Sequence, residues 1–166
     1  MDVLAHYIMV SDKEVDKMMD MSDEVLVAYV ESLREERKDI FCLDTLWDGI
    51  HFLITGKPLE DIDDDDNELS MSIAGVHTFD TDEEIFVGCT EYGELEDIIE
   101  AMESLDIDSL CEKADLSKFR KNGIYPDIWF DENKNALMDD LKKGYGRLLE
   151  FYKVALKKSM NIIVDI

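Results

Sequence analysis

The sequence has few of the residues that interrupt or cross-link a chain. Among its 166 residues there are two prolines, eight glycines and three cysteines. So few breakers, together with 46% hydrophobic residues, are typical of a globular domain and exclude a disordered or low-complexity protein. A chain of this length can bury roughly 70% of its unfolded surface around one core, so we expect a single domain spanning residues 1–166.

The cysteine pattern and the lack of long hydrophobic runs exclude several classes of protein. Cys42, Cys89 and Cys111 form neither an even set nor a C-x-x-C pair, which argues against a disulfide framework or a zinc knuckle. No stretch approaches the roughly 20 apolar residues of a membrane span, and the first residues, MDVLAHYIMV, lack the basic region of a signal peptide. We therefore expect a cytoplasmic protein with reduced thiols.

Basic residues are scarce, and this is the strongest feature of the composition. Lys and Arg number 17 against 41 acidic residues, for a net charge of −24, and residues 57–115 carry 21 of the acids and only two basic side chains. Such a surface repels phosphates and anionic headgroups, so we expect neither nucleic-acid nor membrane binding. The acidity favours a basic protein partner bound through residues 60–103, or it serves solubility alone.

Sequence motifs for cofactors and nucleophiles are absent. The chain contains no G-x-S-x-G, no phosphate-cradling glycine loop and no dinucleotide fingerprint. Its histidines, His6, His51 and His77, have no H-x-x-x-H spacing. We therefore predict no cofactor and no transition-metal site.

The acidic run DIDDDDNE starts like a calcium loop but does not continue as one. Asp61, Asp63 and Asp65 match the first three ligand positions of an EF-hand. However, the sixth position is Asp66 rather than glycine, and the twelfth is Ser72 rather than glutamate. The run is therefore interpreted as a solvated loop, and no calcium site is predicted.

Hydrophobic periodicity predicts the α+β class: a single compact domain of several helices packed on a small mixed β-sheet that includes the N- and C-terminal strands. Strands are expected at 3–10, 84–89 and 161–166, and residues 69–79 are expected to form one strand, or two across a turn. Helices are expected at 12–20, 23–37, 94–105 and about 135–160, with short helical segments over 107–122. Asn122 and Gly123 close the last of these segments.

The stretch WDGIHFLITG, residues 47–56, places polar groups inside an otherwise apolar helix. Asp44 or Thr45 is expected to cap this helix, and Gly56 to end it. Asp48 and His51 are three residues apart, close enough for a carboxylate to orient an imidazole.

These two residues are the catalytic candidates, and aromatic side chains complete the cleft of this hypothesis. In this interpretation Trp47, Tyr125 and Trp129 line the cleft and bind a ligand. The structural alternative is that Asp48 caps a neighbouring segment, Trp47 fills the core and His51 satisfies a buried carbonyl. Both interpretations stay open at the level of the sequence.

The chain resembles the YfbM-like family (DUF1877), a bacterial domain family of unknown function. The resemblance is carried by WDGIHFLITG, by GIYP with a tryptophan three residues after the proline, by LLEFYKVA and by the apolar C-terminal strand. It departs at the acidic insertion 60–68 and at Ala74-Gly75, where two glycines would be expected. The resemblance implies a small α+β domain and no established catalytic residue.

Together these observations favour a non-enzymatic binding domain that acts through its acidic surface. The alternative is a small enzyme or ligand-binding protein with a cleft around Trp47, Asp48 and His51. Exposure of Asp48 and His51 in a concave site would favour the alternative.

Overall fold

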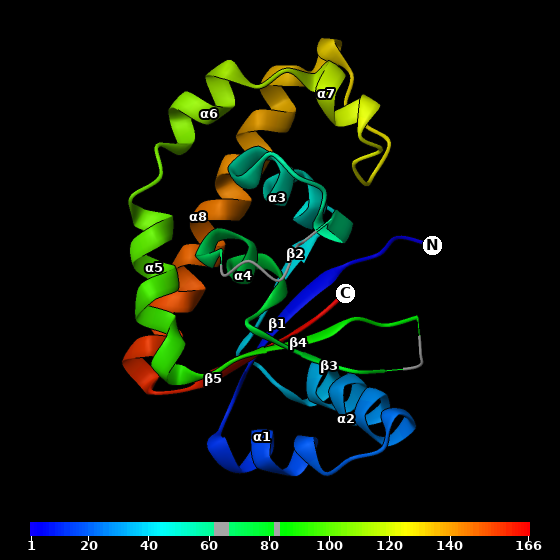
Figure 1. Ribbon diagram of the computed structural model, residues 1–166, viewed down its shortest axis with the longest axis vertical. Helices are drawn as coiled ribbons and strands as arrows, with labels where there is room; N and C mark the ends of the chain where they lie inside the picture. The colour runs from blue at the N-terminus through cyan, green and yellow to red at the C-terminus, as the bar shows by residue number, and fades with distance from the viewer. Residues whose placement is uncertain (62–66, 82–83) are drawn as a thin grey trace.

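The computed structural model describes residues 1–61, 67–81 and 84–166, and its centre is a five-stranded sheet (Figure 1). The strand order is β2-β1-β5-β4-β3. The strands are β1 (Ala5–Val10), β2 (Ile40–Asp44), β3 (His77–Phe79), β4 (Val87–Thr90) and β5 (Asn161–Asp165). Every pairing in the described part of the chain is antiparallel, so the sheet is not mixed. The C-terminal strand is central and pairs with the first, as predicted.

Helices cover both faces of this sheet (Figure 1). On one face lie α1 (Asp12–Met19) and α2 (Asp23–Glu36). On the other side lie α3 (Trp47–Thr55), α4 (Glu68–Ala74), α5 (Leu95–Glu103), α6 (Ile107–Lys113), α7 (Leu116–Lys121) and α8 (Lys134–Lys158). Short 3-10 turns occur at η1 (Leu59–Asp61), η2 (Tyr92–Glu94) and η3 (Asp131–Asn133). The chain is thus an α+β domain with two helical layers.

The two layers follow from the side-chain alternation of a strand. Along β1, Tyr7 and Met9 contribute to the larger hydrophobic core, whereas Ile8 and Val10 contribute to the smaller core under α1 and α2. Successive strand residues point to opposite faces, so a strand that is apolar on both faces requires cover on both.

No helix in the described ranges is long and apolar enough to cross a bilayer.

Local capping signals locate some helix ends correctly and others not. Ser11 and Glu14 form the predicted capping box of α1, with Ser11 Oγ accepting from the Glu14 amide at 3.3 Å. The cap predicted for α3 at Asp44 or Thr45 is wrong, because α3 begins at Trp47 and Asp44 instead accepts a hydrogen bond from the Thr45 amide. Gly56 ends α3 in the left-handed conformation, with φ 75°.

The strand predicted over residues 69–79 is wrong for its first half. Residues 68–74 form the helix α4, and only His77–Phe79 is a strand. Asn67 caps the helix by accepting from the Leu69 amide at 2.9 Å. Ile73 is the only β-branched residue between 68 and 74, so intrinsic strand propensity is weak and packing on neighbouring helices decides the conformation.

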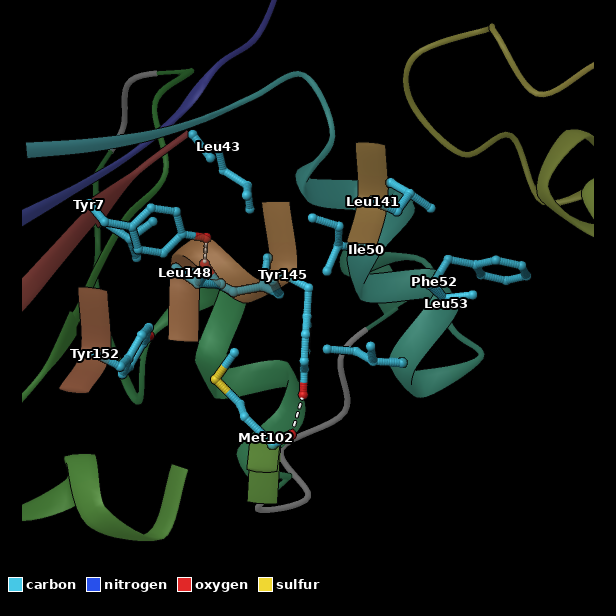
Figure 2. Close-up of a cluster of buried hydrophobic side chains, with 14 of the residues drawn as sticks. Tyr7, Leu43, Ile50, Phe52, Leu53, Met102, Leu141, Tyr145, Leu148 and Tyr152 are labelled. Carbon is cyan, nitrogen blue, oxygen red and sulfur yellow. Dashed lines mark hydrogen bonds between the residues drawn. The ribbon is translucent and has the colours of Figure 1, made fainter. Parts of the chain in front are cut away.

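Buried tyrosines tie the core to these helices (Figure 2). Tyr145 on α8 donates to the Met102 carbonyl of α5 at 2.6 Å, and Tyr152 donates to the Ser72 carbonyl of α4 at 2.8 Å. Burial raises the pKa of Tyr145 to about 12, so its hydroxyl stays a donor at neutral pH. Each hydroxyl satisfies a carbonyl that water does not reach.

Two glycines on α8 provide a test of the packing. A Cβ at Gly146 would meet no atom within 4 Å, whereas one at Gly144 would lie 3.1 Å from Ile50 Cδ1 and 3.3 Å from Leu43 Cδ1. Gly146→Ala should therefore raise the free energy of unfolding by up to about 1 kcal/mol, the difference in helix propensity. In Gly144→Ala that gain should be cancelled by crowding. Urea unfolding of the two variants measures the difference, and equal stabilisation would contradict the close approach of α3 and α8.

Candidate functional site

The helix α3 is buried on nearly every side, including its polar residues. Asp48 is 7% exposed and His51 is 1% exposed. The helix packs against α4, α6 and α8. Buried charged and polar groups need hydrogen-bond partners, so the partners of these two residues decide what they do.

Asp48 is occupied by two backbone amides from distant segments. Its Oδ1 accepts from the Leu59 amide at 3.0 Å, and its Oδ2 accepts from the Tyr125 amide at 2.9 Å. Leu59 and Tyr125 follow Asp48 by 11 and 77 residues. The carboxylate therefore fastens η1 and the loop after α7 to the start of α3.

His51 bridges the end of its own helix to α4. Its Nδ1 lies 2.7 Å from the Lys57 carbonyl and its Nε2 lies 2.9 Å from Ser70 Oγ. A carbonyl only accepts, so the network assigns the proton to Nδ1 and leaves Nε2 to accept from the Ser70 hydroxyl. Desolvation lowers the pKa of His51 below its usual 6.5, against the opposing effects of the Lys57 carbonyl and the Asp48 charge.

Trp47 and Tyr125 stack on each other beside Asp48, and the N-terminal segment bonds to both. Their ring centroids are 5.6 Å apart with an interplanar angle of 25°. Trp47 Nε1 donates to the Val3 carbonyl at 3.0 Å, and the Val3 amide donates to the Tyr125 hydroxyl at 2.9 Å. Both rings are half-buried, and their polar atoms already hold residue 3.

Trp129 lies in the core on the other side of α3. It is 1% exposed, and its Nε1 donates to the Ile124 carbonyl at 2.9 Å. A Cβ on Gly49 would come within 2.3 Å of the Trp129 ring, so the glycine of WDGI leaves space for this indole. The tryptophan packs on Phe119 with centroids 4.8 Å apart.

The structure thus brings three of the five candidate residues together and separates the other two. Trp47, Asp48 and Tyr125 meet at the start of α3, whereas His51 faces α4 and Trp129 fills the core. Within the described residues, the oxygens of Asp48 bond to the Leu59 and Tyr125 amides. The ring nitrogens of His51 bond to Lys57 and Ser70. Among the described residues, Asp48 and His51 thus do not form the carboxylate–imidazole pair that their spacing suggested, and each is instead bonded to other parts of the fold.

A polar cluster that the sequence pattern did not reveal is formed by His6 of β1, Arg34 of α2 and Asp165 of β5. Asp165 is 2% exposed, and its Oδ2 is 2.9 Å from Arg34 Nη1. Its Oδ1 and the Nδ1 of His6 face each other at 3.8 Å and are both buried without a hydrogen-bond partner. Burial raises the pKa of Asp165 to about 6, opposed by Arg34. Only strand register, which sets His6 opposite Asp165, could have revealed this pair.

A second cluster joins β3 to the turn before α5. His77 Nε2 is 3.0 Å from Glu94 Oε1, which also accepts from the Glu91 amide at 3.1 Å. One ligand atom from each of His77, Glu91 and Glu94 lies within 4.8 Å of the others, a spacing that a metal ion tolerates. Glu91 and Glu94 form a reciprocal capping box around η2, so this arrangement is accounted for by a helix cap with a hydrogen bond between His77 and Glu94.

The role of Asp48 can be tested by removing one acceptor. Asp48→Asn keeps the size of the side chain but presents an amide NH2 to one of the two backbone amides, which would leave a buried donor unpaired. We expect the free energy of unfolding to fall by about 1–3 kcal/mol, measured as the urea midpoint. Asp97→Asn, an exposed change on α5, is the matched control and should alter stability by less than about 0.5 kcal/mol. Equal midpoints for the two variants would show that Asp48 is not a structural acceptor.

The lowered pKa of His51 gives stability a defined pH dependence. Below pH 6.5 the unfolded chain protonates this histidine while the folded protein resists, so the unfolded state binds more protons and stability falls as pH falls. His51→Gln has no such group. The destabilisation caused by His51→Gln should therefore be largest near pH 8 and shrink toward pH 5 in urea unfolding. A difference that is constant over this range would contradict the buried, neutral imidazole.

Comparisons with known proteins agree with this architecture. The family model described as a domain of unknown function (DUF1877) matches residues 1–164. Protein YfbM of Escherichia coli (strain K12) is 23% identical over 169 residues, with 100% of this chain and 99% of the relative covered. The crystal structure of YfbM from Escherichia coli, a protein of unknown function by its own description, matches with a TM-score of 0.85 and 20% identity over 99% of each chain. Since the family model spans nearly every residue, the chain belongs to the DUF1877 family of domains.

Proposed function

We propose that this protein is a non-enzymatic cytoplasmic binding module that takes a basic segment of a protein partner on its acidic surface within residues 60–103. The observation that carries the proposal is the α5 acidic face, which we define as Glu96, Asp97 and Glu100. All three side chains are exposed, and no cation of the described ranges pairs with them. Unpaired charge of one sign on a rigid helix attracts a partner of the opposite sign.

The α5 acidic face is held in place by the opposite side of the same helix. Leu95, Ile98 and Met102 are 0–1% exposed, and Met102 also accepts the hydrogen bond from Tyr145. The helix therefore presents its acids from a fixed backbone. Such an arrangement loses little conformational entropy on binding.

The neighbouring acids are less available. Glu103 forms an ion pair with Lys153 at 2.9 Å, and Glu94 is half-buried against His77. Glu60 and Asp61 are exposed on η1. Residues 62–66 of the acidic run lie outside the described residues, so their part in this surface stays a prediction, as does the expectation that the run is a solvated loop without a calcium site.

Two alternatives compete with this proposal. The acidity can serve solubility alone. In that case, removing acids from any one surface should affect binding of a basic peptide no more than removing them from another. The catalytic alternative around Trp47, Asp48 and His51 has less support, because backbone groups and Ser70 occupy the polar atoms of Asp48 and His51. A position-dependent effect of charge distinguishes binding from solubility.

The test uses a lysine-rich peptide of 12 residues that contains glycine and one central alanine but no large apolar residue. The triple variant Glu96→Gln, Asp97→Asn, Glu100→Gln should bind this peptide about fivefold to tenfold more weakly than the wild type at about 20 mM salt. The difference should vanish near 0.5 M salt, where screening shortens the range of the interaction to a few ångströms. Fluorescence anisotropy with a labelled peptide measures both affinities.

The matched control removes the same charge elsewhere on the molecule. The control triple variant carries Glu112→Gln, Glu132→Gln and Asp140→Asn, which replace three exposed acids outside residues 60–103. This variant should bind the peptide nearly as tightly as the wild type does. Equal weakening by the two triple variants would support solubility charge and overturn the binding face. Circular dichroism melts of all three proteins check that folding is intact.

A further inference from the structure

A groove lies between the α1–α2 layer and the edge of the sheet. Its volume is about 540 Å³, within the roughly 300–1,000 Å³ of sites that hold ligands. It is lined by residues 15, 18, 19, 21, 23 and 26 of the α1–α2 layer, 77–80 of β3 and its end, and 89 and 91 of β4 and its end. All of these belong to the described part of the chain.

The groove exists because α1 and α2 cover the sheet unevenly. The order β2-β1-β5-β4-β3 places the three-residue strand β3 at the edge. The apolar residues of the helices pack on Ile8, Val10 and Ile163 of β1 and β5 and on Val87 and Cys89 of β4, but the cluster has no fully buried member on β3. Phe79 of β3 is only half-buried at the margin of that core, so the apolar face continues past the helices.

Methionines supply the apolar wall of the groove. Met18 is 1% exposed and forms its base, Met21 is half-buried, and Met19 is 69% exposed at its mouth. The Cys89 thiol adds to the apolar surface, because burial raises its pKa to about 12 and keeps it protonated. Unbranched thioethers adapt their shape to different apolar groups, so this wall suits a flexible aliphatic side chain.

The rim of the groove is acidic. Asp80 and Glu91 are exposed on it, Asp23 is half-buried, and no lysine or arginine is among the described residues that line it. Glu91 also caps η2, which runs directly into α5. Negative charge thus continues along the chain from the groove into the α5 acidic face.

We propose that this groove receives one long aliphatic side chain, such as leucine, from the basic polypeptide segment that binds the α5 acidic face. This inference rests on the proposed function and adds the anchor to it. An apolar wall under an acidic rim complements a side chain that is flanked by lysine or arginine. Acidic residues continue from the groove into the α5 acidic face. They complement a polypeptide that carries several positive charges better than a small amine that carries one.

The test compares the alanine-containing peptide above with a second peptide in which leucine replaces that alanine. The wild type should bind the leucine peptide about tenfold more tightly, since each buried methylene contributes roughly a factor of four before the cost of ordering the side chain. Met19→Gln should reduce this ratio to less than about threefold and leave the alanine peptide unaffected. Val25→Gln, which changes an exposed residue of α2 outside the groove, is the matched control and should keep the tenfold ratio.

Methyl NMR locates the contact independently of affinity. The leucine peptide should shift the methyl signals of Met18, Met19 and Met21 and leave those of Met102 and Met138 in the larger core unchanged. The alanine peptide should move the groove signals much less. This readout does not depend on how well any variant folds.

The outcomes separate the anchor from the proposed function. The anchor is overturned if the wild type binds both peptides with equal affinity, or if the methyl signals of the groove do not shift. Binding of both peptides that weakens with salt would still support the proposed role of the α5 acidic face. Failure of both peptides to bind overturns the proposed function and the anchor with it. Binding of isobutylamine as tight as that of the leucine peptide would make the occupant a small amine and overturn the polypeptide assignment.

Discussion

The carboxylate of Asp48 accepts backbone amides from two segments that are far apart in sequence, and the arrangement around α3 depends on this interaction. The oxygens bind Leu59 and Tyr125 at 3.0 and 2.9 Å. Inside a protein an unpaired carboxylate or amide is costly, so each group requires the other. The position of Tyr125 then sets its stack on Trp47, and through Val3 the path of the N-terminal segment into β1.

Other buried polar residues of the core also bond to groups on different segments. His51 joins Lys57 to Ser70, and Tyr145 and Tyr152 satisfy carbonyls of α5 and α4. These groups have the chemistry of an active site, but their donors and acceptors are used to position helices. Buried and paired polar groups of this kind specify one packing.

Local sequence signals predicted those parts of the fold that depend on a few neighbouring residues. The capping box at Ser11, the stop at Gly56 and the stripe of α5 are of this type. The helix α4 was missed because its conformation depends on contacts with Tyr152 and His51, 80 and 19 residues away. The candidate residues of WDGIHFLITG were identified as polar exceptions, but their backbone partners come from loops that no spacing rule connects to α3. The groove likewise joins three separate stretches of chain.

Ion pairs on the surface show where the large negative charge is neutralised and where it is not. Lys153 on α8 pairs with Glu103, and Lys142 pairs with Asp108, so the basic residues of α8 offset acids at the end of α5 and on α6. Exposed pairs contribute little stability, so their main effect is on the local field. The acids earlier on α5 have no such cation within the described ranges. Since like charges repel in the folded state, leaving these acids unpaired costs stability, and the burial of Leu95, Ile98 and Met102 on the opposite side of α5 holds the helix in place against this repulsion.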